Sequence, residues 1–193
     1  TSIPKDVIKT NVYPSIYPDY EGVTIPDGIA PLNFNYSGHD KIECMDVVVR
    51  GAKGGEIHSN GDYAQFNIDE WHQLVSQNKG GKLFFSVCVE REGKWFQYKD
   101  FIMYVSKYAL CEYGLTYRKI APGYEVYSKM GIYQRDLSNY NESAILENTV
   151  APNACLNCHT ANRTDPKQFT FHVRGANGAT LVQVNGKRTW LNT

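Results

Sequence analysis

Two cysteines and a histidine stand within five consecutive positions, in the stretch Cys155-Leu156-Asn157-Cys158-His159. This is the C-x-x-C-H spacing at which c-type haem is attached to a protein. The two thiols add across the two vinyl groups of one porphyrin, and the histidine that follows is placed to ligate the iron. The motif therefore predicts a covalent haem c held by Cys155 and Cys158, with His159 as a metal ligand.

Three other uses of a C-x-x-C pair have to be weighed against haem: a structural disulfide, a redox dithiol and half of a zinc site. The sequence contains no second C-x-x-C and no H-x3-5-H pair that would complete a zinc site. No alternation of strands and helices surrounds the motif, as it does in thioredoxin-like proteins. We therefore favour haem over these alternatives.

A second axial ligand of the iron has two candidates in the sequence. His172 lies on a predicted strand that could fold back over the haem, although packing beneath a hairpin would equally explain this histidine. Met130 is its rival. A thioether ligand raises the reduction potential, whereas a second imidazole lowers it. An open sixth position is the third alternative.

Basic side chains near the motif are candidates for pairing with the haem propionates. Arg174 is the first of these, and Arg163 and Lys167 are also near in sequence. An ordinary solvated charge is the alternative for each. The predicted cofactor-binding set is thus Cys155, Cys158, His159 and Arg174.

The patterning of the rest of the chain predicts a mainly β protein that positions this motif. Residues 29–122 contain short apolar strands typical of an immunoglobulin-like or fibronectin type III-like β-sandwich, with one inserted helix. The helix begins after Asn67, a favourable N-cap residue, and ends at Gly80-Gly81.

Two segments flank the predicted sandwich. Residues 1–28 contain four prolines with tyrosines between them, which predicts an extended arm. Residues 123–193 carry the haem motif, and we expect irregular or short helical structure around it. A β-hairpin follows at the C-terminal end, with its turn at glycines and Asn177.

Charge and hydropathy limit the partners of the chain. The sequence has 20 basic and 20 acidic residues, which argues against nucleic acid. No apolar run is long enough for a transmembrane helix. Because haem c is attached outside the cytoplasm, we expect a periplasmic or outer-membrane-associated protein whose export signal has been removed, with a lipid anchor upstream of residue 1 as an option. Cys44, Cys88 and Cys111 could supply one disulfide.

Four stretches of the chain, taken in order, resemble a known family: I-Y-P-D-Y at 16–20, I-A-P-L-N-F at 29–34, C-L-N-C-H at 155–159 and F-H-V-R-G at 171–175. Together they are similar to the front part of exported bacterial proteins described as TolB-like or cytochrome c-type. In that family a β-domain and a C-x-N-C-H segment precede a β-propeller. Residues 1–193 contain no such propeller segment. The resemblance implies export and a haem site, in either a short member or a fragment.

Two hypotheses of function follow from these observations. The first is an exported c-type cytochrome-like domain that passes single electrons to a partner protein of the cell envelope. The second is a non-catalytic β-sandwich interaction module, in which Cys155 and Cys158 form a disulfide or stay reduced. No G-x-S-x-G, H-E-x-x-H or P-loop motif is present, so no enzyme activity is predicted.

Overall fold

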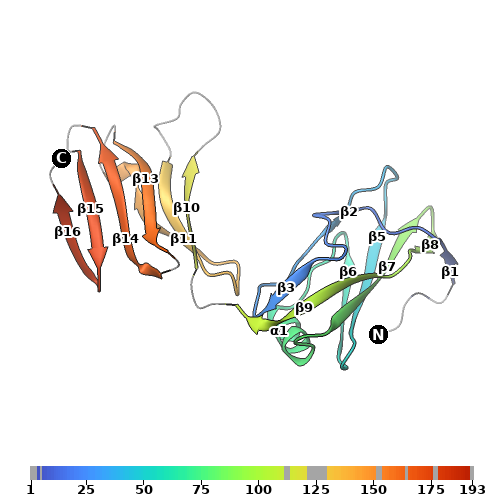
Figure 1. Cartoon of the computed structure of the whole chain (residues 1–193). Helices are drawn as coiled ribbons and strands as arrows, with labels where there is room; N and C mark the ends of the chain where they lie inside the picture. Colours follow the sequence, from blue (N-terminus) through green and yellow to red (C-terminus); the bar gives the residue numbers. More distant parts are fainter. Residues whose placement is uncertain are drawn as a thin grey trace. The chain divides into compact units, whose positions relative to one another are not determined.

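The computed structural model describes residue 4 and residues 6–110, 114–120, 130–150, 154–163, 165–175 and 178–191. The chain divides into two compact units, residues 1–110 and 111–193 (Figure 1). The predicted mainly β architecture with one helix is confirmed. Within the described residues, no helix is long and apolar enough to cross a membrane.

Unit 1, residues 1–110, is built on a seven-stranded sheet with β5 and β7 at its centre. The seven strands are β1 (Val7–Lys9), β3 (Thr24–Asp27), β5 (Cys44–Gly51), β6 (Glu56–Gly61), β7 (Lys82–Arg91), β8 (Lys94–Gln97) and β9 (Phe101–Ala109). The sheet forks at β7, because the first part of this strand pairs with β9 and the last part pairs with β8. A separate pair of short strands, β2 (Ile16–Tyr17) and β4 (Asn35–Tyr36), lies outside this sheet.

The N-terminal residues 1–28, predicted to form an arm, contribute strands to unit 1. β1 pairs in parallel with β8, and β3 pairs in parallel with β9. Both pairings join segments that lie far apart in the sequence. The prolines within residues 1–28 predicted only an extended backbone and gave no information on these distant partners. Proline is tolerated at such edge positions because its missing N–H is not needed there.

The helix α1 (Ile68–Gln77) begins where the sequence predicted. The Asn67 side chain accepts hydrogen bonds from the backbone N–H groups of Asp69 and Glu70. Phe66 stacks on Trp71, with ring centroids 5.5 Å apart. The helix ends at Asn78, ahead of the predicted glycine pair.

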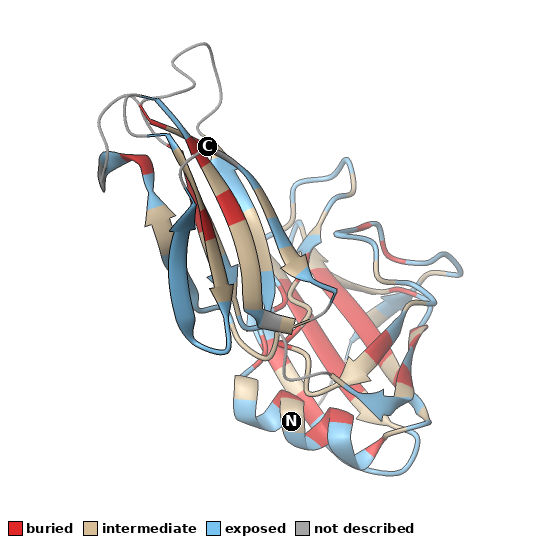
Figure 2. Cartoon of the chain, turned by 60° about the vertical axis from the view of Figure 1, so that its left-hand side comes forward, coloured by how far each residue is buried: buried red, intermediate tan, exposed pale blue. Residues whose placement is uncertain are grey.

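The core of unit 1 lies between one face of the sheet, α1 and the loops that pack with them. Buried residues run along the middle strands and one side of the helix (Figure 2). The aromatic part of this core consists of Phe34, Phe66, Trp71, Phe85, Tyr98 and Phe101. Phe85 and Phe101 stack with centroids 4.7 Å apart.

Unit 2, residues 111–193, contains two antiparallel sheets that share one small core. The three-stranded sheet has β10 (Leu115–Ile120), β11 (Met130–Arg135) and β12 (Glu142–Glu147), followed by the 3-10 helix η1 (Asn148–Val150). The four-stranded sheet has β13 (Cys155–Asn162), β14 (Asp165–Arg174), β15 (Ala179–Val184) and β16 (Lys187–Leu191). Their shared core is Met130, Ile132, Ala154, Leu156, Phe171, Val173 and Leu181.

Two expectations about the C-terminal part are corrected by unit 2. The strand at 115–120 pairs with β11 in unit 2, whereas we predicted it within the sandwich, and the division falls after Leu110. The haem-motif segment, predicted irregular or helical, is the strand β13, because its backbone pairs with β14. The predicted helical stretch before Met130 and the turn residue Asn177 lie outside the described residues.

The predicted C-terminal hairpin is present as β14 and β15, and β16 extends it. Asn185 and Gly186 connect β15 to β16 with φ values of 49° and 76°. Positive φ at both positions is the requirement of a tight type I′ hairpin turn, which favours the Asn-Gly pair.

Candidate haem-attachment site

The C-x-x-C-H motif lies on β13, which pairs antiparallel with β14 in the orange part of the ribbon (Figure 1). Cys155 is opposite Arg174, Cys158 is opposite His172, and His159 is opposite Phe171. The register shifts between Leu156 and Cys158, so β13 has one extra residue at this point. The motif therefore contains a β-bulge.

The bulge decides where the two thiols point. In a regular strand, residues three positions apart face opposite sides of the sheet. Residues directly opposite each other face the same side, and the two partners of the cysteines, His172 and Arg174, are two positions apart on β14. Cys155 and Cys158 consequently share one side of the sheet with His172 and Arg174, which we term the thiol face.

Both thiols of the motif are free in this structure. Cys158 is exposed, and Cys155 is half-buried and packs against the unit 2 core. Neither is engaged in a disulfide, and their position on one face leaves them available to one planar ligand.

His159 lies on the other side of the sheet. Its partner Phe171 is only 4% exposed and belongs to the unit 2 core. The Nδ1 atom of His159 is buried and has no hydrogen-bond partner among the described residues. With β13 paired in this way, the imidazole predicted to ligate iron points away from the thiols that would hold the haem.

His172 lies on the thiol face, directly across from Cys158. Its Nδ1 is 2.9 Å from Oγ1 of Thr180 on β15, and this is the ring's hydrogen bond within the described part of the chain. A hydrogen bond at one ring nitrogen fixes the plane of the imidazole and directs the other nitrogen elsewhere. His172 is therefore an oriented imidazole beside a free thiol.

Met130, the rival ligand, lies beside the motif on its core side. It is 5% exposed, and its Sδ accepts a hydrogen bond of 3.3 Å from the backbone N–H of Leu156. Leu156 is paired with Val173, which also faces the core. The structure thus places Met130 near the motif but away from the thiol face.

The three predicted propionate partners occupy different places. Arg174 is exposed on the thiol face, opposite Cys155. Arg163 lies in the turn between β13 and β14, with φ of 56°. Lys167 lies on β14 between Asp165 and Phe169, where the register against β13 shifts, so strand alternation does not assign its side chain to a face. Of the three, Arg174 is the one that the register places on the thiol face.

Two of the remaining cysteines belong to unit 1. Cys44 and Cys88 are free, and Cys111 is outside the described residues. Burial, with added repulsion from Asp46 and Asp100, raises the pKa of Cys88 to about 12. Cys88 is therefore a neutral core thiol. Across the described ranges, no group of three or more His, Cys, Asp and Glu side chains is arranged to hold a metal ion.

Sequence reasoning missed a buried polar pair in unit 1. Asp46, 4% exposed within an apolar strand, accepts hydrogen bonds from His58 at 2.8 Å and Asn60 at 3.0 Å. The sequence signal was a carboxylate, Asp46, inside the apolar run 45–49. That His58 and Asn60 share its face follows from the pairing of β5 with β6.

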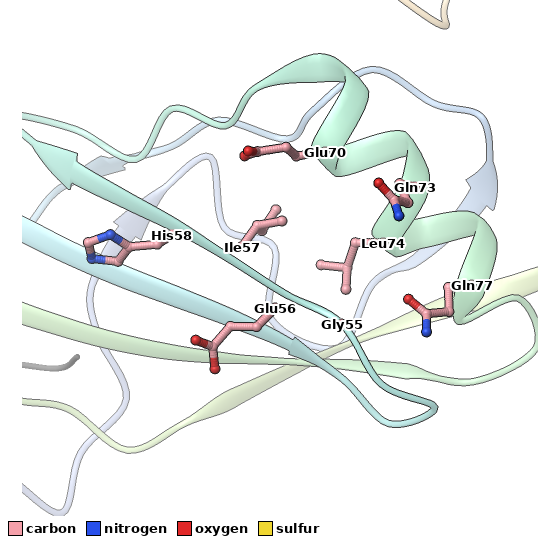
Figure 3. A pocket seen from close by; sticks show the side chains of 8 residues that line it. All are labelled: Gly55, Glu56, Ile57, His58, Glu70, Gln73, Leu74 and Gln77. Atoms are coloured by element: carbon pink, nitrogen blue, oxygen red, sulfur yellow. The ribbon is translucent and has the colours of Figure 1, made fainter. Parts of the chain in front are cut away.

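The same histidine borders a polar groove of about 490 Å³ between β6 and α1. Figure 3 shows the residues that line it: Gly55, Glu56, Ile57, His58, Glu70, Gln73, Leu74 and Gln77. Carboxylates and amides dominate this lining.

Comparison with protein-family models and with curated proteins found no match for this chain. The resemblance to TolB-like and cytochrome c-type proteins therefore stays an expectation from the quoted motifs.

Proposed function

We propose that unit 2 carries one haem c, attached by thioethers to Cys155 and Cys158, and that the chain passes single electrons to a protein partner. The observation that carries this proposal is the bulge in β13, which sets both free thiols of a C-x-x-C-H motif on one face. A bound haem would supply the one-electron couple.

The other residues of the thiol face suit the same group. His172 offers an imidazole to the metal, and Arg174 offers a guanidinium to a propionate. His159 fits this arrangement only if β13 leaves its pairing with β14, because its ring now faces the core. The proposal therefore assigns the covalent attachment to the two cysteines.

The proposal includes a location outside the cytoplasm and an electron-transfer partner. Attachment of haem c takes place outside the cytoplasm, so the protein would act in the periplasm or at the outer membrane, as the family resemblance also implies. An electron-transfer partner in the cell envelope follows from the chemistry, and a lipid anchor upstream of residue 1 would keep the chain near it.

Mass spectrometry of the denatured protein tests attachment directly. The chain is expressed with an export signal alongside haem c maturation machinery, denatured and weighed. We expect a mass raised by one haem that survives denaturation, and no such increase in the Cys155→Ser/Cys158→Ser double variant. The matched control Cys44→Ser, a free cysteine of unit 1, should keep the haem.

A bare polypeptide mass in the wild-type protein would overturn the cytochrome proposal. The second hypothesis, an interaction module of an envelope complex, would then be preferred. It has its own structural support in β16, whose residues are all exposed, with Trp190 at 54% and Leu191 at 49% exposure. Exposed aromatic residues on a strand are common at protein–protein contacts.

A further inference from the structure

Resting on the proposed function, we infer that His172 ligates the haem iron on the thiol face and that Thr180 positions its imidazole for this role. The motif alone assigns the ligand to His159. The tertiary arrangement favours a histidine from the neighbouring strand.

A row of paired residues across the four-stranded sheet carries the inference. Cys158 on β13 is opposite His172 on β14, which is opposite Thr180 on β15. Neighbouring strands are about 4.8 Å apart, so all three side chains leave the same face within a short span. A haem tethered at Cys158 would lie against this row.

The hydrogen bond to Thr180 gives the His172 ring the orientation of a metal ligand. Metal-ligating histidines usually bond one ring nitrogen to a protein group, which fixes the ring and leaves the other nitrogen for the metal. Here the Nδ1 atom is 2.9 Å from the hydroxyl oxygen of Thr180, so Nε2 is the nitrogen left to face a ligand.

His159 would have to reach the iron at a structural cost. Its move to the thiol face would break the backbone pairing of β13 with β14 at Phe171. His172 needs no change of the backbone. This difference separates the two histidines even though His159 is adjacent to Cys158 in sequence.

The electron paramagnetic resonance spectrum of the ferric haem tests the assignment, because it reports the axial ligands. In protein shown by mass to carry haem, His172→Ala should lose the wild-type spectrum, and added imidazole should restore it. His159→Ala should keep that spectrum. If His159→Ala prevents covalent attachment of haem, only His172→Ala tests the inference. A His172→Ala spectrum identical to that of the wild type overturns it.

Thr180 is tested as a positioning residue by a conservative series. Thr180→Val should shift the spectrum and the reduction potential of the attached haem, while Thr180→Ser should restore both. The matched control Thr189→Val is on the same face, one row away on β16 and exposed, and should match the wild type. Equal behaviour of Thr180→Val and Thr189→Val would overturn the role of Thr180.

A readout without haem keeps the two proposals separate. In the haem-free protein, NMR nuclear Overhauser contacts should show one fixed orientation of the His172 ring beside Thr180 in the wild type and averaged contacts in Thr180→Val. A wild-type ring without a fixed orientation overturns the positioning role directly. Wild-type protein without attached haem overturns the proposed function and this inference together, whereas attached haem with an unchanged His172→Ala spectrum overturns this inference alone.

Discussion

At the scale of single residues, side chains of the same type differ in exposure and hydrogen bonding according to their place in a strand. Cys158 is exposed on a sheet face, whereas Cys88 is 0% exposed in the centre of the unit 1 sheet. His172 has a hydrogen-bonded ring on the thiol face, whereas His159 has a buried Nδ1 without a partner among the described residues. Reactivity therefore follows from strand position and not from residue type.

Cys88 should make folding stability fall in the alkaline range. The unfolded thiol loses its proton near the ordinary pKa of 9.0, while the folded one keeps it to a pKa of about 12. Between these values the folded state binds more protons than the unfolded state, so stability is full below pH 9 and is lost as the pH rises through this window. Cys88→Ala should show a smaller decline of the urea midpoint from pH 9 upward.

The control for this measurement is Cys44→Ala, a half-buried cysteine of the same sheet, which should keep the wild-type decline. Tyr98 titrates in the same window, since burial and a hydrogen bond with Tyr36 raise its pKa to about 12. In Cys88→Ala the urea midpoint should therefore still decline above pH 9, but less than in the wild type. If the urea midpoint fell equally steeply with pH in the wild type and in Cys88→Ala, the prediction would be contradicted.

At the scale of elements, one buried amide joins the end of α1 to the hairpin between β5 and β6. Asn78 is 0% exposed, and its Nδ2 donates to the carbonyl oxygens of Gly54 and Leu74. Its Oδ1 accepts from the backbone N–H of Lys53. A Cβ at Gly51 would lie 2.0 Å from this amide, which explains a glycine there.

Replacement of Asn78 should destabilise unit 1 strongly. Asn78→Ala removes three hydrogen bonds, among them those to the Lys53 N–H and the Gly54 carbonyl, while the Leu74 carbonyl keeps its bond from the backbone N–H of residue 78. We therefore expect a loss of about 3 kcal/mol in the free energy of unfolding. Urea denaturation followed by tryptophan fluorescence measures it. Ser76→Ala, an exposed change in the same helix, is the matched control and should be near neutral. A loss below about 1 kcal/mol in Asn78→Ala would refute this role.

At the scale of the whole molecule, each unit has a core of its own. The aromatic core of unit 1 and the smaller core of unit 2 have no residue in common. The last backbone hydrogen bond of unit 1 before the division joins the N–H of Leu110 to the carbonyl of Asp27, at 2.6 Å. Unit 1 therefore has the parts of an independent folding domain.

Residues 1–110 produced alone should fold cooperatively. We expect a single urea transition followed by tryptophan fluorescence, because Trp71 is fully buried in this core. His159→Ala in the complete chain should leave the same transition in place. A fragment without a cooperative transition would show that unit 1 depends on unit 2 for its fold.

Local signals in the sequence predicted the parts of the fold that local interactions form. The N-cap at Asn67 and the turn at Asn185-Gly186 act over a few residues, and both were found where expected. β1 pairs with β8 and β3 pairs with β9, and both partners are distant in the sequence. The local proline content therefore led us to predict an extended arm for residues 1–28. The strand state of β13 was missed for the same reason, since its hydrogen-bond partners are supplied by β14.

For the candidate site, the sequence by itself determined the residue types and the spacing of Cys155, Cys158 and His159, and hence the chemistry worth testing. Only the tertiary structure decided which face of the sheet each side chain occupies. The physical reason is that a strand alternates its side chains and a bulge reverses that alternation, and both depend on pairing with another strand. That pairing puts His172 with the two thiols and turns His159 toward the core.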